Sequence, residues 1–247
     1  MMTWANSNAR EIFVNTSIPT YKGFVKYPKT LLQDKEYVAL YKPAGWLVYG
    51  EAPSVTEWNY SRGGGKLFPV HRLDKDTEGV LLYGKSADFA SRLTRLFETK
   101  KIRKTYLAWS LGSPEHTEGK IRIPLRKKSS DPEQSARTDY RVLKTLEVQG
   151  MTLTLFALEP KTGRFHQIRK HLKGIGCPIV GDSKYLTEVQ YRALTKALGP
   201  HPMCLCAASL EFAHPKTGKP VRITSAPQWP KKLMVRPAIL RTQSSST

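Results

Sequence analysis

The sequence predicts an α+β fold: a mixed, mainly antiparallel β-sheet with flanking helices. Most of the chain consists of short runs in which apolar and polar residues alternate, as in strands with one buried face. Only three segments carry apolar residues at the spacing of a helix. Since no internal repeat is present, we expect one domain rather than an array of similar units.

The 247 residues are expected to divide into three parts. Residues 1–30 are rich in Asn, Ser, Thr and Lys, and predict an N-terminal extension, either plain or the remnant of an organelle-targeting segment. Residues 31–235 are expected to form the folded domain, and 236–247, which end in RTQSSST, a flexible tail. No apolar run resembles a secretory signal or a membrane span.

The first predicted strands lie on both sides of a turn. The segment EYVALYKPAGWLVYG, 36–50, predicts two short strands around the Lys-Pro-Ala-Gly turn at 42–45. The apolar run VLLYG, 80–84, predicts a further strand. Ser86 is a favourable N-cap for a helix over about 87–100. The apolar face of this helix consists of Phe89, Leu93, Leu96 and Phe97.

The segment KIRKTYLAWSLG, 101–112, predicts a strand with two different faces. One face, expected in the core, consists of Leu107, Trp109 and Leu111. The other consists of Lys104, Tyr106 and Ala108, where a tyrosine beside a cation suits the lining of a cleft. Residues 128–136 predict a polar loop. Further strands are predicted at EGKIRIPL (118–125), ARTDYRVLKTL (136–146), MTLTLFALE (151–159), MCLCAASLEFAH (203–214) and KPVRITSA (219–226).

The segment GRFHQIRKHLKGIG, 163–176, predicts a short helix that Gly174 or Gly176 ends. Its apolar stripe consists of Ile168, Leu172 and Ile175. The polar residues off this stripe are His166, Arg169, Lys170 and Lys173. A further helix is predicted over 187–198.

The charge balance favours a polyanionic partner. The chain has 40 Lys and Arg against 20 Asp and Glu, a net charge of +20. Residues 160–181 contain five cations and no acid, and the chain from 212 onward contains seven cations and no acid. Nucleic acid is the expected partner, and the alternative is a basic surface without a specific ligand. A membrane is not expected, because no long amphipathic helix with a basic face is present.

Three cysteines do not suggest a disulfide scaffold. Cys204 and Cys206 are too close for a CxxC zinc motif, and no cysteine or acid has suitable spacing to complete a zinc site with His166 and His171. A reducing intracellular compartment is therefore expected.

The stretch HRLDKDTEG, 71–79, places three acids in a basic chain. A calcium loop beginning at Asp74 would need Glu at position 85, which is Lys. A magnesium-dependent phosphoesterase would need a second acidic cluster, and the other acids are scattered. Two interpretations remain: a solvated turn with local ion pairs, or one catalytic carboxylate, Asp74, acting as a nucleophile or a base in a cationic cleft. The basic helix around Arg169 could supply its partner charge.

The same stretch resembles the HRLD signature of the RluA family of RNA pseudouridine synthases. PKTGRFHQIRKHLKGIGCPIVGDSKY, 160–185, resembles the family's second signature, a GRxHQIRxH run followed by a PIxGD turn. Supporting blocks are YKPAGWLV (41–48), KIRKTYLAWSLG (101–112) and LCAASLEFAHPKTGKP (205–220). The resemblance covers about residues 35–230, with the motifs in the expected order.

This resemblance implies the family's fold and activity: the isomerisation of uridine in RNA to pseudouridine, without a cofactor or metal. It assigns catalysis to Asp74, stacking on the flipped base and help in proton transfer to Tyr106, and pairing with the aspartate to Arg169. Asp76 and Glu78 are then turn and scaffold residues. His71 and Arg72 are expected either to position the flipped nucleotide or to pack the loop. The further RNA-binding residues we expect are Lys42, Lys104, Arg164, His166, Lys170 and Lys173.

The sequence departs from the family pattern at three places. TEG follows the HRLD block where TSG is more usual, Tyr49-Gly50 replaces a histidine-containing turn, and Cys177 replaces a common histidine. No separate accessory RNA-binding domain is visible. An RNA-binding assembly factor that does not need catalysis, for example on a pre-ribosomal particle, therefore stays as the alternative to an enzyme. We expect ribosomal RNA as substrate before transfer RNA, a monomer, and either a bacterial-type cytoplasm or the mitochondrial matrix.

Overall fold

The computed structural model describes residues 27–50 and 53–234. The predicted C-terminal tail and residues 1–26 of the predicted extension lie outside the described residues. The first strand, β1, spans Lys29–Gln33 and so begins just inside the expected extension. Its residues pair with the following strand, which explains why this end of the extension is ordered.

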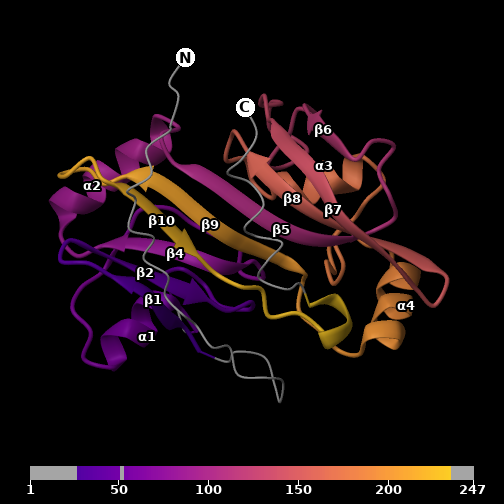
Figure 1. The fold of residues 1–247 in the computed structure, drawn as a ribbon, viewed down its shortest axis with the longest axis horizontal. Coiled ribbons are helices and arrows are strands. Elements are labelled where there is room, and N and C mark those ends of the chain that lie inside the picture. The colour runs from indigo at the N-terminus through magenta and orange to yellow at the C-terminus, as the bar shows by residue number, and fades with distance from the viewer. Residues whose placement is uncertain (1–26, 51–52, 235–247) are drawn as a thin grey trace.

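The centre of the molecule is a ten-stranded sheet with the main order β1-β2-β4-β9-β5-β8-β7-β6, in which β3 pairs with β4 and β10 with β9 (Figure 1). The pairing of β4 with β9 is parallel, and the other strand pairings are antiparallel. The predicted fold class, a mixed and mainly antiparallel sheet with flanking helices, is confirmed. After β1, the strands span Tyr37–Lys42 (β2), Phe68–Pro69 (β3), Glu78–Gly84 (β4), Arg103–Leu111 (β5), Glu118–Ile121 (β6), Thr138–Val148 (β7), Met151–Pro160 (β8), Leu205–Ala213 (β9) and Pro220–Thr224 (β10).

The helices lie on both faces of the sheet. They span Val55–Ser61 (α1), Ala87–Glu98 (α2), Gln167–Gly174 (α3) and Glu188–Leu198 (α4), with a short 3₁₀ turn at Lys231–Leu233. On one face, α2 covers the half of the sheet around β2 and β4, and α4 with the 3₁₀ turn covers the half around β5 and β8. On the opposite face, α1 packs over β2 and β4 and α3 packs over β5 and β8. The two clusters under α1 and α3 meet at Tyr106, which contacts both.

The predicted helix after Ser86 is confirmed in type and in its buried face. The Ser86 hydroxyl accepts a hydrogen bond from Phe89 N at 3.2 Å, which satisfies one of the free amides at the start of α2. Phe89 and Leu93 are buried in the core, and Leu96 and Phe97 pack at its margin. The helix ends at Glu98, two residues before the predicted end.

The predicted second strand within 36–50 is wrong. Leu47 makes only an isolated bridge to Ser54, because the backbone groups of Leu47 and Val48 bond to the chain at the start of α1 instead of to a strand. Helix α1 itself was missed. Its sequence signal is the Ser-x-x-Glu pattern at Ser54 and Glu57, and the Ser54 hydroxyl does accept from Glu57 N at 3.3 Å.

Candidate active site

The structure brings Asp74 and Arg169 together from positions 95 residues apart. Asp74 lies in the turn between β3 and β4, and its carboxylate keeps 24% exposure. Arg169 lies in α3 and is only 7% exposed. Its Nη1 donates to Asp74 Oδ2 at 3.5 Å, so the predicted pairing of the aspartate with the arginine exists in the fold.

A second carboxylate, Asp182, holds Arg169 in this orientation. Arg169 Nε donates to Asp182 Oδ2 and Nη2 donates to Oδ1, both at 2.8 Å. The Asp182 side chain is fully buried and also accepts from the backbone amides of Lys184 and Tyr185. A bidentate, charge-assisted pair is strong and directional, so it leaves Nη1 as the nitrogen directed at Asp74. Sequence reasoning did not select Asp182, although it is the last residue of the PIVGD turn.

His166 completes the surroundings of the Arg169 guanidinium. Arg169 Nη1 donates to His166 Nε2 at 3.0 Å, and His166 Nδ1 lies 3.0 Å from the Tyr185 hydroxyl. Burial lowers the pKa of His166, and the charges of Arg169 and Lys184 lower it further against the opposing effect of Asp74. A neutral ring at neutral pH follows. The backbone of His166 has a left-handed φ of 53°, and α3 begins at the next residue.

Tyr106 lies in β5, on the face of the sheet that carries α1 and α3. Its hydroxyl makes no side-chain hydrogen bond within the described part of the chain. Burial raises the pKa of Tyr106, and the nearby Asp74 carboxylate raises it further. The phenol is therefore protonated at neutral pH and available as a hydrogen-bond donor beside Asp74.

Lys42 does not lie where an RNA could contact it, which corrects its predicted binding role. The side chain is fully buried, and its Nζ donates to the carbonyls of Pro43, Trp46 and Lys75 at 3.0, 2.7 and 2.7 Å. Burial lowers the pKa of Lys42 to about 7. Lys42 is buried because it lies at the end of β2. From there its Nζ bonds both to the turn at 43–46 and to Lys75, the residue after Asp74.

His71 has the packing role that the sequence left open against nucleotide positioning. Its Nε2 accepts from Leu82 N at 3.0 Å, and its ring stacks on Phe97 with 4.5 Å between centroids. Burial, together with the charge of Lys104, lowers the pKa of His71 to about 3. The ring is neutral and ties the loop before Asp74 to β4. Arg72, by contrast, is exposed.

Of the other predicted RNA-binding cations, Arg164, Lys170 and Lys173 lie just before or within α3, close to His166 in the sequence, whereas Lys104 lies on β5 opposite Leu210, in the half of the sheet that α2 covers. Arg164 and Lys173 are exposed, and Lys170 and Lys104 are half-buried. Lys170 and Lys184 lie over the Phe165 ring at 5.5 and 5.9 Å. Lys173 lies over the Tyr185 ring at 5.7 Å. Because Phe165 stacks on His166 and Tyr185 bonds to it, these cations stand beside the Asp74 site. We call the set Arg164, Lys170, Lys173 and Lys184 the basic flank.

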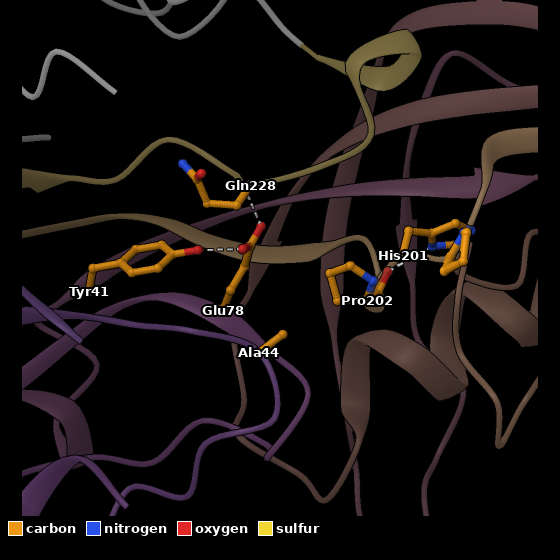
Figure 2. A pocket seen from close by; sticks show the side chains of 7 residues that line it. Tyr41, Ala44, Glu78, His201, Pro202 and Gln228 are labelled. Atoms are coloured by element: carbon orange, nitrogen blue, oxygen red, sulfur yellow. Dashed lines mark hydrogen bonds between the residues drawn. The ribbon is translucent and has the colours of Figure 1, made fainter. Parts of the chain in front are cut away.

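Glu78 is a scaffold residue on the other face of the sheet, as the family resemblance implied. Its carboxylate accepts from the Tyr41 hydroxyl and from Gln228 N, the second at 2.9 Å (Figure 2). It borders a hollow of about 300 Å³ that Ala44 and residues 200–202 also line. Burial raises the pKa of Glu78 to about 7, against the lowering effect of these hydrogen bonds. Asp76 is exposed in the turn.

Two further observations concern metals and membranes. Among residues 27–50 and 53–234, no group of three or more His, Cys, Asp or Glu side chains is placed to hold a metal ion. None of the helices in this part of the chain is long and apolar enough to cross a membrane.

The chain is similar to known proteins of one family. The family model described as RNA pseudouridylate synthase matches residues 36–173. The tRNA pseudouridine synthase C of Haemophilus influenzae is 37% identical over 227 residues, which cover 81% of this chain and 93% of that protein. The protein of the same name from Haemophilus ducreyi is 36% identical over 217 residues, covering 79% of this chain and 89% of that protein.

Solved structures show the same fold. Human RNA pseudouridylate synthase domain containing 4 matches with a TM-score of 0.64 and 27% identity over 82% of this chain and 89% of that chain. Human RNA pseudouridylate synthase domain containing 1 matches with a TM-score of 0.70 over 92% of this chain and 100% of that chain, and at 20% identity it shows the fold alone. The family model and these relatives define the class of protein, an RNA pseudouridine synthase. The chain belongs to the RluA family of RNA pseudouridine synthases, and the predicted enzyme class is confirmed.

Proposed function

We propose that the protein isomerises a uridine of transfer RNA, with Asp74 as the catalytic carboxylate. The observation that carries the assignment is the chain of charges from Asp182 through Arg169 to Asp74, with Nη1 of the arginine 3.5 Å from Asp74. This carboxylate is partly exposed and lies where the clusters under α1 and α3 meet. Tyr106 contacts both clusters.

The reaction breaks the bond between C1′ of the ribose and N1 of the base, rotates the base, and joins C1′ to C5. The proton leaves C5, N1 regains one, and no co-reactant is consumed. A carboxylate can attack the sugar as a nucleophile or remove a proton as a base. Both roles need Asp74 ionised while RNA covers the site. The Arg169 guanidinium supplies the balancing charge, and Asp182 keeps it aimed.

Tyr106 supplies a flat surface and a hydrogen-bond donor. A uridine inside a stacked loop or helix must be turned out of the stack before its glycosidic bond is accessible. An aromatic ring on the α1 and α3 face can receive the flipped base. Because the pKa of Tyr106 is raised by burial and by Asp74, the phenol donates a hydrogen bond rather than acting as a base.

Transfer RNA replaces ribosomal RNA as our preferred substrate. The sequence alone favoured ribosomal RNA, whereas the relatives that are 36–37% identical over most of their length bear the name tRNA pseudouridine synthase C. We also propose a reducing intracellular compartment, which is supported by Cys177, Cys204 and Cys206 being buried and unpaired.

The test is pseudouridine mapping of total RNA from cells that carry wild-type protein, Asp74→Asn or Asp76→Asn. Asp76 is the matched control, because it is an exposed carboxylate two residues away. We expect one transfer-RNA uridine to lose its modification with Asp74→Asn alone. Loss of a pseudouridine in ribosomal RNA instead would overturn the proposal that transfer RNA is the substrate. An unchanged map with a stable, RNA-bound Asp74→Asn protein would overturn catalysis by Asp74 and favour the assembly-factor alternative.

A further inference from the structure

Exposed aromatic side chains lie close together in the sequence, in α1 and the chain before it. Seven large apolar side chains are exposed in the described part of the chain, and three of them, Leu47, Tyr49 and Tyr60, fall within 47–60. Tyr49 is 56% exposed and Tyr60, in α1, is 72% exposed. A further aromatic ring, Trp58, lies between them in the sequence. We call Leu47, Tyr49, Trp58 and Tyr60 the aromatic flank.

The aromatic flank is attached directly to the loop that carries Asp74. Gly45 N donates to Lys75 O at 2.9 Å, and Lys42 Nζ joins the carbonyls of Trp46 and Lys75. Four residues of chain reach at most about 14 Å, so Tyr49 lies within a few nucleotides of the reacting uridine.

The flank also has a rigid base. Tyr83 Oη donates to Val48 O at 3.0 Å, and Val48 and Val55 belong to the same buried cluster that Tyr106 contacts. The segments that carry Tyr49 and Tyr60 are therefore anchored on the same face of the sheet as the proposed base-binding tyrosine.

The two sides of the site differ in chemistry. The α3 side carries the basic flank, whose cations surround Phe165 and Tyr185. The α1 side carries aromatic rings, with the Arg62 guanidinium over Trp58 at 5.4 Å. Figure 1 shows α1 and α3 toward opposite ends of the sheet. Cations bind phosphates whatever the sequence, whereas exposed aromatic rings bind bases only when those bases are unstacked.

We infer that Tyr49 and Tyr60 stack on unpaired bases next to the flipped uridine, while the basic flank holds the phosphates on the other side. The bound RNA is then single-stranded on the α1 side of its target nucleotide. Scattered exposed apolar residues are ordinary on protein surfaces, but here they cluster on the chain segment tied to Lys75. The inference rests on the proposed function, which places the reacting uridine at Asp74.

The test compares the affinity of the protein for a short unstructured RNA with its affinity for the same strand annealed to its complement. The variants are Tyr49→Ala, Tyr60→Ala and both together, with Tyr49→Phe and Tyr60→Phe retaining a ring. Val189→Ala is the matched control, because Val189 is exposed on α4, which covers the opposite face. We expect each Tyr→Ala change to weaken single-strand binding about five-fold or more. The Phe variants and Val189→Ala should bind as wild type does, and duplex binding should change little.

Wild-type affinity in both alanine variants, or an equal loss for single strand and duplex, would overturn the inference. Thermal unfolding of each variant identifies any that fail to fold, and the Phe variants then decide whether a ring is needed. The result is separable from the proposed function. If the Asp74→Asn map shows no lost modification while the alanine variants lose single-strand binding, the aromatic flank stands and only the catalytic assignment falls.

Discussion

Arg169 shows how one residue acquires its role from its neighbours. Its Nε and Nη2 are taken by Asp182, and Nη1 is shared between Asp74 and His166. The Asp182 pair is the shorter one and is fully buried, whereas the contact with Asp74 is longer and partly exposed. Asp182 therefore sets the direction of the guanidinium, which leaves Nη1 directed at Asp74.

Replacing Asp182 with Asn should slow the reaction without abolishing RNA binding. The change removes one charge-assisted partner, so Arg169 is no longer held toward Asp74. We expect kcat to fall about ten- to one-hundred-fold, the equivalent of one hydrogen bond to a charged group, with a smaller change in KM. Single-turnover kinetics with excess enzyme measure this. Asp88→Asn, an exposed acid in α2, is the control. An unchanged kcat in Asp182→Asn would contradict the positioning role.

Glu78 makes the stability of the protein depend on pH. Its folded-state pKa is raised from 4.5 to about 7 by burial, so the folded state binds a proton more tightly than the unfolded state. The stabilisation by this proton is complete below the unfolded-state pKa and is lost as pH rises through about 7. We expect the unfolding free energy of wild type, relative to Glu78→Gln, to fall by about 3 kcal/mol between pH 4.5 and 7.

Urea denaturation at several pH values measures this difference. Glu188→Gln, which changes an exposed acid in α4, is the control. A difference for Glu78→Gln that does not change with pH would contradict the raised pKa of Glu78.

At the scale of elements, the helices predicted correctly, α2, α3 and α4, are those with an apolar stripe, and α2 and α4 also have a side-chain cap that α3 lacks. α2 has Ser86 and a stripe that meets β4, and α4 has a capping box between Thr187 and Gln190. α1 has only seven residues and buries only Val55 among its members. A helix this short has no full apolar repeat, so only its capping pattern could have revealed it.

The contribution of α2 to stability can be measured at two neighbouring leucines. Leu93 is fully buried against the sheet, whereas Leu96 packs at the margin of the same cluster. We expect Leu93→Ala to lower the unfolding free energy by about 3 kcal/mol, because it leaves a cavity in the core, and Leu96→Ala by about 1 kcal/mol. Denaturant titration compares the two, and equal losses would mean that α2 does not pack as described.

For the whole molecule, the net charge of +20 acts through its distribution. Lys42 is buried, and part of the remaining excess lies in the basic flank beside Asp74 and Arg169. Cations that contact phosphates release counterions when RNA binds. The salt dependence of the RNA affinity should therefore indicate how many cations of the basic flank contact phosphates.

We expect the logarithm of the RNA affinity to fall with the logarithm of salt concentration with a slope of about −3, from four flank cations on a single strand. Lys173→Gln should reduce the magnitude of this slope by about 0.7. Lys196→Gln removes an exposed cation from α4 and should leave the slope unchanged. Fluorescence anisotropy at several salt concentrations measures both. A flat salt response in wild type would exclude the basic flank as the phosphate-binding surface.

The sequence by itself determined the fold class, most of the strands, the helix after Ser86 and the family, because alternation, capping and motifs are local patterns. It also predicted Asp74, Tyr106 and Arg169 as site residues, and the structure places Arg169 and Tyr106 close to Asp74. Only the tertiary structure decided that Lys42 is buried and that Glu78 faces away from the cleft. Likewise, only the tertiary structure showed that Asp182 pairs with Arg169 and that Tyr49 and Tyr60 of the aromatic flank are exposed. Each of these depends on which distant segment packs against the residue, and burial, direction and hydrogen-bond partners are set by that contact and not by the residue's neighbours in the chain.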